Sequence, residues 1–283
     1  MTLRVTNVLC AFVLIAAATT PSAGQQADEQ QTFNEIKKLG WQVGPSVGKV
    51  ARRASLAIPA NHGFLAAADT SKFLTLLKNL PQQDSYTIAP GDLHWFAVFD
   101  FDPVGYIKDD EKVDADAVLK VLKEGNVRGN EERRRRGYPV VHLEGWFVAP
   151  HYDETTKRLE WATKLKGESG DVSVNYKIRL LGRAGVMSAV LVSDPDSLEK
   201  DIRSFRAVLD GFSFDSGERY AEYRTGDKVA EYGLAGLIVG GAAAAAAKSG
   251  FFKVIGKFAI FIFAGAAAVV MGLVRWLFQR RAT

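Results

Sequence analysis

Three polar side chains alternate along one predicted strand in the second half of the chain. Within residues 173–181, Asn175, Lys177 and Arg179 are each two positions apart. Successive residues of a β-strand point to opposite faces, so these three side chains share one face. Arginine and lysine donate several hydrogen bonds from a positive charge, which suits them to carboxylates and phosphates. The spacing therefore predicts a concave, anion-binding face on this strand.

Aromatic side chains on the neighbouring predicted hairpin extend this face. Trp146, Tyr152 and Trp161 would form aromatic walls beside the strand, although tryptophans are as readily explained as core residues. The hairpin tip and the following glycine-bounded turn add further polar groups. The predicted ligand or partner surface comprises Trp146, His151, Tyr152, Asp153, Trp161, Asn175, Tyr176, Arg179 and Arg183.

Paired carboxylates offer a second kind of chemistry. Asp153, Glu160 and Glu144 are candidates for the acid and base of a hydrolase or transferase that acts on envelope polymers, with Arg179 or Arg183 holding an anion. Such chemistry needs two carboxyl groups roughly 5–10 Å apart in a cleft. The sequence has no Gly-x-Ser-x-Gly elbow and no Walker loop. A non-enzymatic binding or scaffolding module is the leading hypothesis, and we assign no catalytic residues.

Metal and cofactor sites are not predicted. The four histidines are scattered without a metal-ligand spacing, and the calcium-loop-like run after Asp100 is broken by Val104 and Lys108. His151–Asp153 is more simply a turn in which the aspartate caps the backbone. Cys10 is the only cysteine and lies in the apolar N-terminal run, so we expect the mature protein to contain no thiol.

The distribution of charge indicates a membrane protein. The 283 residues carry a formal charge of +4, but all 32 acidic residues and 29 of the 36 basic ones lie between Asp28 and Glu231, a net charge of −3. The other seven basic residues flank apolar segments. Basic residues in these positions are typical of membrane topology, not of a nucleic-acid surface, so no nucleic-acid partner is expected.

The two ends of the chain predict its domain organisation. Residues 1–24 resemble a signal peptide, and residues 254–276 contain an uncharged apolar run of 17 residues that we predict to be a transmembrane helix. Residues 25–230 form the predicted extracytoplasmic domain and residues 277–283 a short basic tail. The Gly/Ala-rich residues 231–253 are either a juxtamembrane segment or a second membrane helix, because their apolar part would span only about 22 Å.

Hydrophobic periodicity gives the elements that position these residues. Strands are expected at 48–58, 93–101, 140–148, 159–165, 173–181, 185–193 and 211–214, the last returning to the sheet. Helices are expected at 31–38, 70–80, 197–209 and from 114 onward, where residues 131–136 either continue the helix or form a charged loop. The strands come in hairpins and the helices come separately. The fold class is therefore α+β, with a mainly antiparallel sheet and flanking helices, plus the C-terminal transmembrane helix.

Three segments carry a resemblance to a known family. GYIKDDEKVDAD (105–116), GWFVAPHYDETTKRLEWA (145–162) and VNYKIRLLGRAGVMSAVLV (174–192) resemble blocks of a family of uncharacterised bacterial membrane-anchored proteins defined by a domain of unknown function. The resemblance implies a periplasmic domain tethered to the inner membrane by its C-terminus, and it implies no activity. Independently of the resemblance, we expect the binding or scaffolding module to recognise an envelope protein, through the Gly/Ala-rich helix or the soluble domain, or an envelope ligand. FRAVLDGFSF (205–214) is also similar to the end of PsbP-like α/β/α sandwich domains, which implies fold only.

Overall fold

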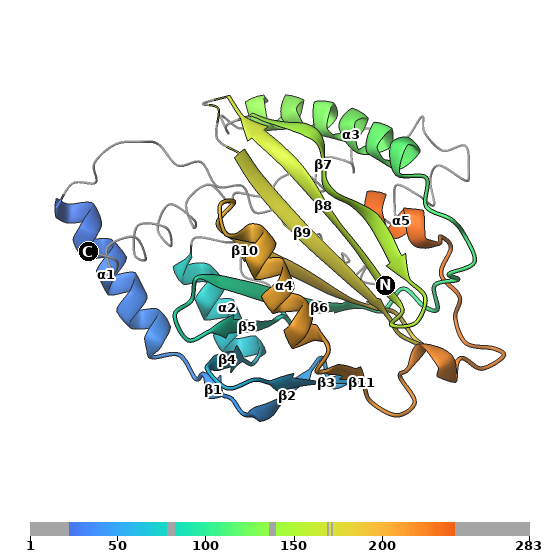
Figure 1. Cartoon of the computed structure of the whole chain (residues 1–283), viewed down its shortest axis with the longest axis horizontal. Helices are drawn as coiled ribbons and strands as arrows, with labels where there is room; N and C mark the ends of the chain where they lie inside the picture. Colours follow the sequence, from blue (N-terminus) through green and yellow to red (C-terminus); the bar gives the residue numbers. More distant parts are fainter. Residues whose placement is uncertain (1–22, 78–82, 136–139, 169, 171, 241–283) are drawn as a thin grey trace, which may run out of the picture.

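The centre of the molecule is one large antiparallel sheet (Figure 1). The computed structural model describes residues 23–77, 83–135, 140–168, 170 and 172–240. In spatial order the strands are β1 (Gln42–Val43), β4 (His62–Leu65), β5 (Tyr86–Pro90), β6 (Trp95–Asp102), β10 (Val186–Ser193), β9 (Val172–Leu181), β8 (Arg158–Gly167) and β7 (Val141–Asp153). All neighbouring pairs are antiparallel.

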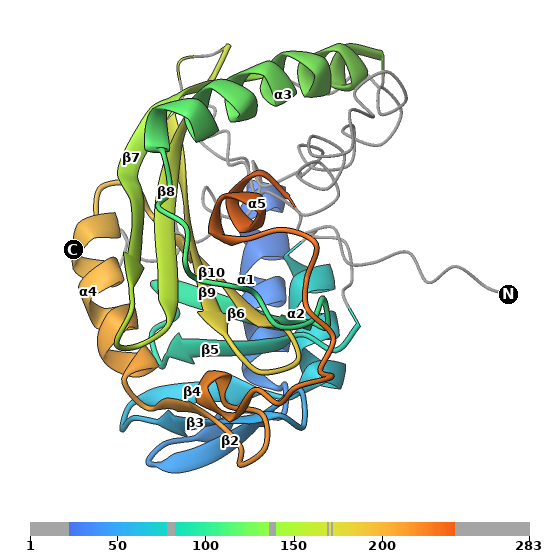
Figure 2. The ribbon, with the colours of Figure 1, turned by 90° about the vertical axis from the view of Figure 1, so that its right-hand side faces the viewer.

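A smaller sheet and the helices cover both faces of the large sheet. The small sheet has the order β11 (Phe212–Phe214), β3 (Ala54–Ile58) and β2 (Ser46–Val50). The helices are α1 (Ala23–Lys37), α2 (Ala67–Leu76), α3 (Ala115–Arg135), α4 (Leu198–Leu209), the short 3-10 helix η1 (Tyr220–Glu222) and α5 (Leu234–Val239). Figure 2 shows α3 and α5 on one side of the large sheet and α4 on the other.

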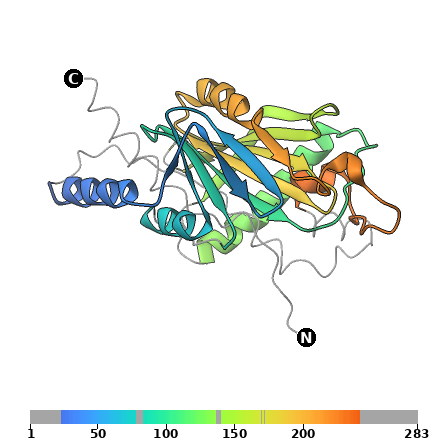
Figure 3. The same ribbon diagram turned by 90° about the horizontal axis from the view of Figure 1, so that it is seen from below.

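Alternation along the strands divides the core into two layers. On β10, Val186, Val190 and Val192 belong to one layer, together with residues of α2, α3 and α5. Met187 and Leu191 point the other way and pack with α4 and the small sheet. We call these the α3 face and the α4 face of the large sheet. In the view of Figure 3, α1 projects from one end of this body.

The predicted α+β class with a mainly antiparallel sheet is confirmed. Both predicted hairpins form, as β7–β8 and β9–β10. The expected start of α3 is also found, because the carboxylate of Asp114 accepts hydrogen bonds from the backbone N–H groups of Asp116 and Ala117 at 3.1 and 3.0 Å.

Two strand predictions were wrong. Residues 48–58 are the β2–β3 hairpin and not one strand, because Ala51 and Arg52 take positive φ angles of 53° and 54° and reverse the chain. Neither residue type signals such a turn. The short strand β11 does not return to the large sheet; it pairs with β3 in the small one.

The predicted membrane segments fall largely outside the described residues. Within the part of the chain that the structure describes, we find no helix that combines the length and the apolar character needed to cross a bilayer. Residues 254–276 and 277–283 lie outside that part, as do residues 1–22 of the predicted signal peptide. The first residues of the Gly/Ala-rich segment form α5, which buries Leu234, Leu237 and Ile238 in the core of the α3 face and ends at Gly240, where φ is +94°.

Candidate binding site on the α3 face

Charged and polar side chains meet at the middle of the α3 face. Ser188 on β10 pairs with Asp100 on β6 and with Arg179 on β9, so these three residues form a row across three strands. Asp102 lies two positions after Asp100 on β6, and Lys177 lies two positions before Arg179 on β9. Because side chains alternate along a strand, both point to the same face of the sheet as this row. We call these five residues the charged cluster. Asp100 is 4% exposed and Arg179 is 8% exposed.

Two carboxylate oxygens of the charged cluster have no hydrogen-bond partner. Asp100 Oδ2 and Asp102 Oδ1 are both buried and both unpartnered. The guanidinium of Arg179 lies over the ring of Trp161, 5.2 Å from its centre, and its Nη1 donates to the carbonyl of Ile178 at 3.0 Å. Buried polar groups in folded proteins are nearly always hydrogen-bonded, because an unmade bond costs stability. The charged cluster therefore holds unused hydrogen-bonding capacity.

Burial shifts the acid–base properties of this cluster strongly. Burial raises the pKa of Asp100 to about 7, against the opposing charge of Arg179 and with a smaller contribution from the nearby Asp102. Burial also raises the pKa of Asp102. The pKa of Lys177 is lowered to about 8 by burial and by the positive charge of Arg179. Two groups that titrate close to neutral pH thus share one face, and such perturbed groups gather at functional sites.

Several residues of the predicted surface lie on this face. Asn175 is buried two positions from Lys177, and Trp161 is directly opposite Lys177 on β8. Trp146 is half-buried at the edge of the same core layer and donates from Nε1 to the carbonyl of Ala115 at 3.2 Å. The alternation on β9 thus brings Asn175 and Arg179 together with an aromatic side chain, while both tryptophans also contribute to the core.

The acidic half of the charged cluster, Asp100 and Asp102, is not among the residues predicted from the sequence. Asp100 and Asp102 lie at the end of an aromatic strand, and the sequence patterns relate them only to a broken calcium loop and not to Arg179. Charged residues are rarely fully buried without a partner, so two aspartates in a strand of this kind were a usable signal.

Tyr152 belongs to a hydrogen-bonded group at the end of the β7–β8 hairpin. Its hydroxyl donates to Asp109 Oδ2 at 2.6 Å, and the same carboxylate accepts from Lys157 Nζ at 2.7 Å and from the Tyr220 hydroxyl at 2.7 Å. Burial opposes ionisation of Asp109, but these three donors hold its pKa below the ordinary value. Burial and the Asp109 carboxylate raise the pKa of Tyr152. This group fastens the loop before α3 to the hairpin.

The remaining predicted residues lie elsewhere. His151 is exposed on β7, and Asp153 accepts from the backbone N–H of Thr155 and the hydroxyl of Thr156, both at 2.8 Å. Arg183 makes two hydrogen bonds to Asp227, at 2.7 and 2.8 Å. These contacts stabilise turns and do not form a common surface with the charged cluster.

Tyr176 lies on the opposite face of the sheet. Its hydroxyl donates to Glu160 Oε2 at 2.5 Å and accepts from Arg206 Nε on α4 at 3.0 Å. Arg206 also binds both carboxylate oxygens of Glu160. This network ties α4 to the sheet.

The three carboxylates proposed for catalysis are engaged by different partners. Glu160 is held by Tyr176 and Arg206, and Glu144 forms an ion pair with Lys164 at 2.9 Å. Hydrogen bonds lower the pKa of Glu144, through Lys164, and that of Asp153, through the turn that follows it. A general acid needs a raised pKa, so the lowered pKa values of Glu144 and Asp153 do not suit these residues to that role. Among the described residues, no three His, Cys, Asp or Glu side chains are placed to hold a metal ion.

The fold and the charged cluster define an antiparallel α+β domain with a polar site inside one core layer. The chain belongs to the family described as protein of unknown function (DUF2167), which matches residues 42–274. Among solved structures it is similar to PsbP (CyanoP) from the cyanobacterium Synechocystis sp. PCC 6803, at 11% identity over 59% of this chain and 90% of that chain, with a TM-score of 0.33. No curated protein matches the chain.

Proposed function

We propose that this chain is a binding module of the bacterial cell envelope that recognises a protein or ligand through the α3 face. On this proposal the domain is periplasmic, and residues 254–276 hold it in the inner membrane. The apolar, uncharged run within those residues and the confinement of all acidic residues to Asp28–Glu231 support the anchor.

One observation carries the binding role: the charged cluster keeps two buried carboxylate oxygens without partners. A cluster whose only task was stability would pair these atoms or replace them with apolar groups, since unpaired buried charge is strongly destabilising. Proteins tolerate such a cost at functional sites. A ligand that displaces the side chains covering Asp100 and Asp102 and donates hydrogen bonds to them would satisfy both oxygens.

A binding role fits the structure better than catalysis. The candidate acids and bases of the hydrolase hypothesis are held in ion pairs and turns, with the pKa values of Glu144 and Asp153 lowered. The cluster itself offers donors and acceptors on one face, and the buried ring of Trp161 supports the guanidinium of Arg179. Such a combination is typical of sites that orient a bound group.

The test compares two double variants of the full-length protein. Asp102→Asn with Lys177→Met removes one acid and one base from the charged cluster, so the net charge is unchanged. Glu144→Gln with Lys164→Met does the same at the exposed ion pair on β7 and β8, where the two charges are 2.9 Å apart. Each protein is crosslinked in intact cells, released in mild detergent and weighed by native mass spectrometry.

We expect the unmodified protein and the Glu144/Lys164 variant to retain the same added mass, a companion protein or a small ligand. The Asp102/Lys177 variant should lose most of it. Equal retention by both variants would overturn the assignment to the α3 face, and a bare chain in all three samples would overturn the binding role.

A further inference from the structure

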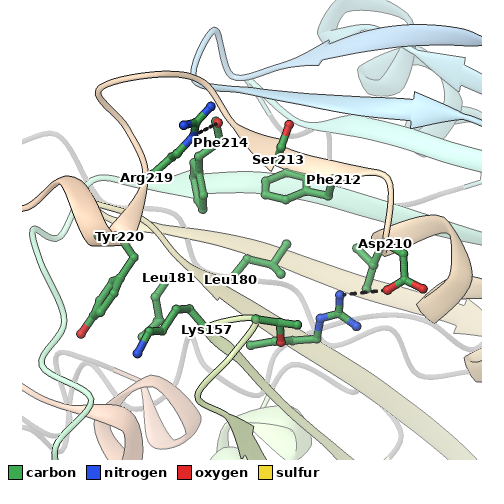
Figure 4. Close-up of a pocket in the computed structure, with 13 residues that line it drawn as sticks. Lys157, Leu180, Leu181, Asp210, Phe212, Ser213, Phe214, Arg219 and Tyr220 are labelled. Carbon is green, nitrogen blue, oxygen red and sulfur yellow. Dashed lines mark hydrogen bonds and ion pairs between the residues drawn. The ribbon is translucent and has the colours of Figure 1, made fainter.

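A pocket of about 400 Å³ lies away from the charged cluster and shares no residue with it (Figure 4). It opens where β8 and β9 meet the end of α4, the short strand β11 and η1. Its size falls within the range of small-molecule sites, roughly 300–1,000 Å³. Polar and apolar side chains contribute about equally to the walls, and the apolar part includes Leu180, Leu209, Phe214 and Tyr220, all buried in the fold.

The charged residues that line this pocket are mostly positive. Lys157, Arg158 and Arg219 face a single acidic residue, Asp210. Lys157 is already bound to Asp109 at 2.7 Å, and Arg219 Nε donates weakly to the carbonyl of Phe214 at 3.4 Å. Of the three, Arg158 has the most deeply buried side chain, and its ion pair with Asp210 is long.

Arg158 has hydrogen-bonding capacity left over. Its Nε is buried and has no partner, and its side chain is only 14% exposed. Its Nη2 lies 3.7 Å from Asp210 Oδ1, beyond hydrogen-bond distance, and the Asp210 side chain is 77% exposed. A buried guanidinium facing a solvated carboxylate at this distance is poorly paired. An oxyanion inside the pocket would accept from the Nη groups at the accessible end of the guanidinium and complete the pairing of the charge.

We propose that this pocket binds a small organic carboxylate, with the charged group on Arg158 and an apolar ring or short chain against Leu180, Phe214 and Tyr220. The charge of the lining residues supports this proposal, because three basic residues and only one exposed acidic residue line the pocket beside its apolar wall. This ligand is independent of whatever binds the α3 face.

The experiment uses the full-length protein in mild detergent and two fluorinated probes, followed by ¹⁹F NMR. The probes are 4-(trifluoromethyl)benzoate and its neutral counterpart 4-(trifluoromethyl)benzamide, with protein-free micelles as the blank. We expect the benzoate to bind and the benzamide to bind at least about tenfold more weakly, because the charge-assisted hydrogen bonds are absent.

Two variants should shift benzoate affinity in opposite directions. Arg158→Met should weaken binding by about tenfold or more, since it removes the partner of the carboxylate. Asp210→Asn should strengthen it severalfold, because it removes the competing negative charge from an exposed position. Arg128→Met on the exposed surface of α3 also removes one positive charge and should leave the affinity unchanged.

A third variant covers the case in which Arg158→Met does not fold. Ser213 lines the pocket and is exposed, so Ser213→Trp should fill the pocket, abolish benzoate binding and leave the fold intact. The proposal is overturned if the two probes bind equally, if Arg158→Met binds the benzoate as the unmodified protein does, or if a folded Ser213→Trp protein keeps the full affinity.

Discussion

At the scale of single residues, the protonation of Asp100 on the α3 face makes the stability of the protein depend on pH. The pKa of Asp100 in the folded protein is raised to about 7 from an ordinary value of 3.8, so between these values the folded state binds more protons than the unfolded state. Stability falls with rising pH wherever that holds. The contribution of Asp100 to the free energy of unfolding is fully present below pH 3.8 and is lost as the pH rises through 7.

Replacing Asp100 with asparagine should remove this pH dependence. Relative to Asp100→Asn, the unmodified protein should lose roughly 2–3 kcal/mol of unfolding free energy between pH 5 and pH 7, at about 1.4 kcal/mol per pH unit. Urea unfolding at pH 5, 6 and 7 measures the difference. A constant difference across this range would show that Asp100 does not titrate there.

The Glu160–Tyr176–Arg206 network makes a different prediction, about the attachment of α4. Arg206→Met leaves the carboxylate of Glu160, buried in the sheet, without its cation. We expect a loss of about 2 kcal/mol in unfolding free energy, less than for a fully buried pair because Arg206 is partly exposed.

The control for this prediction lies on the same helix. Arg203 is exposed on α4, so Arg203→Met should change the unfolding free energy by no more than about 0.5 kcal/mol. Similar losses in the two variants would mean that the network adds nothing beyond helix propensity.

At the scale of elements, the turn of the β2–β3 hairpin is strained. Arg52 is exposed and has a φ of 54°, a conformation that glycine adopts without penalty. Arg52→Gly should therefore raise the unfolding free energy by about 0.5–1 kcal/mol. Thermal unfolding compares it with Arg52→Ala, which removes the same side chain but keeps the strain. Equal melting temperatures for the two variants would contradict this explanation.

The same turn shows which elements the sequence could predict. The β9–β10 hairpin was foreseen because apolar alternation on both sides brackets Gly182 and Gly185, whereas Ala51 and Arg52 give no sign of a reversal. The position of this turn is determined by the pairing of β2 with β3, because alanine and arginine do not favour a positive φ by themselves.

The candidate site was predictable only within one strand. Alternation on β9 placed Asn175, Lys177 and Arg179 on one face, and the structure agrees. The link to Asp100 depends on the strand order β6–β10–β9, which brings together segments nearly 80 positions apart. Local patterns do not encode that order, so the acidic half of the cluster became visible only in the folded molecule.

At the scale of the whole molecule, the proposed envelope topology predicts opposite accessibility for two positions. Val47 is 59% exposed on the small sheet, so a cysteine there should react with a membrane-impermeant maleimide in spheroplasts. A cysteine at Thr283, in the predicted cytoplasmic tail, should react only after lysis. Both variants are made with Cys10→Ser, which removes the only native thiol. The reverse labelling pattern would contradict a periplasmic domain.

The central claim is that the α3 face holds a buried carboxyl group, Asp100, one oxygen of which the fold leaves without a hydrogen-bond partner. Selective ¹³C labelling of aspartate carboxyl groups in the full-length protein, followed by an NMR titration with Asp100→Asn for assignment, tests it directly. We predict that Asp100 titrates with a pKa near 7. A midpoint at or below the ordinary value of 3.8 would mean that Asp100 is held in a structural ion pair, and the reason for assigning binding to this face would be gone.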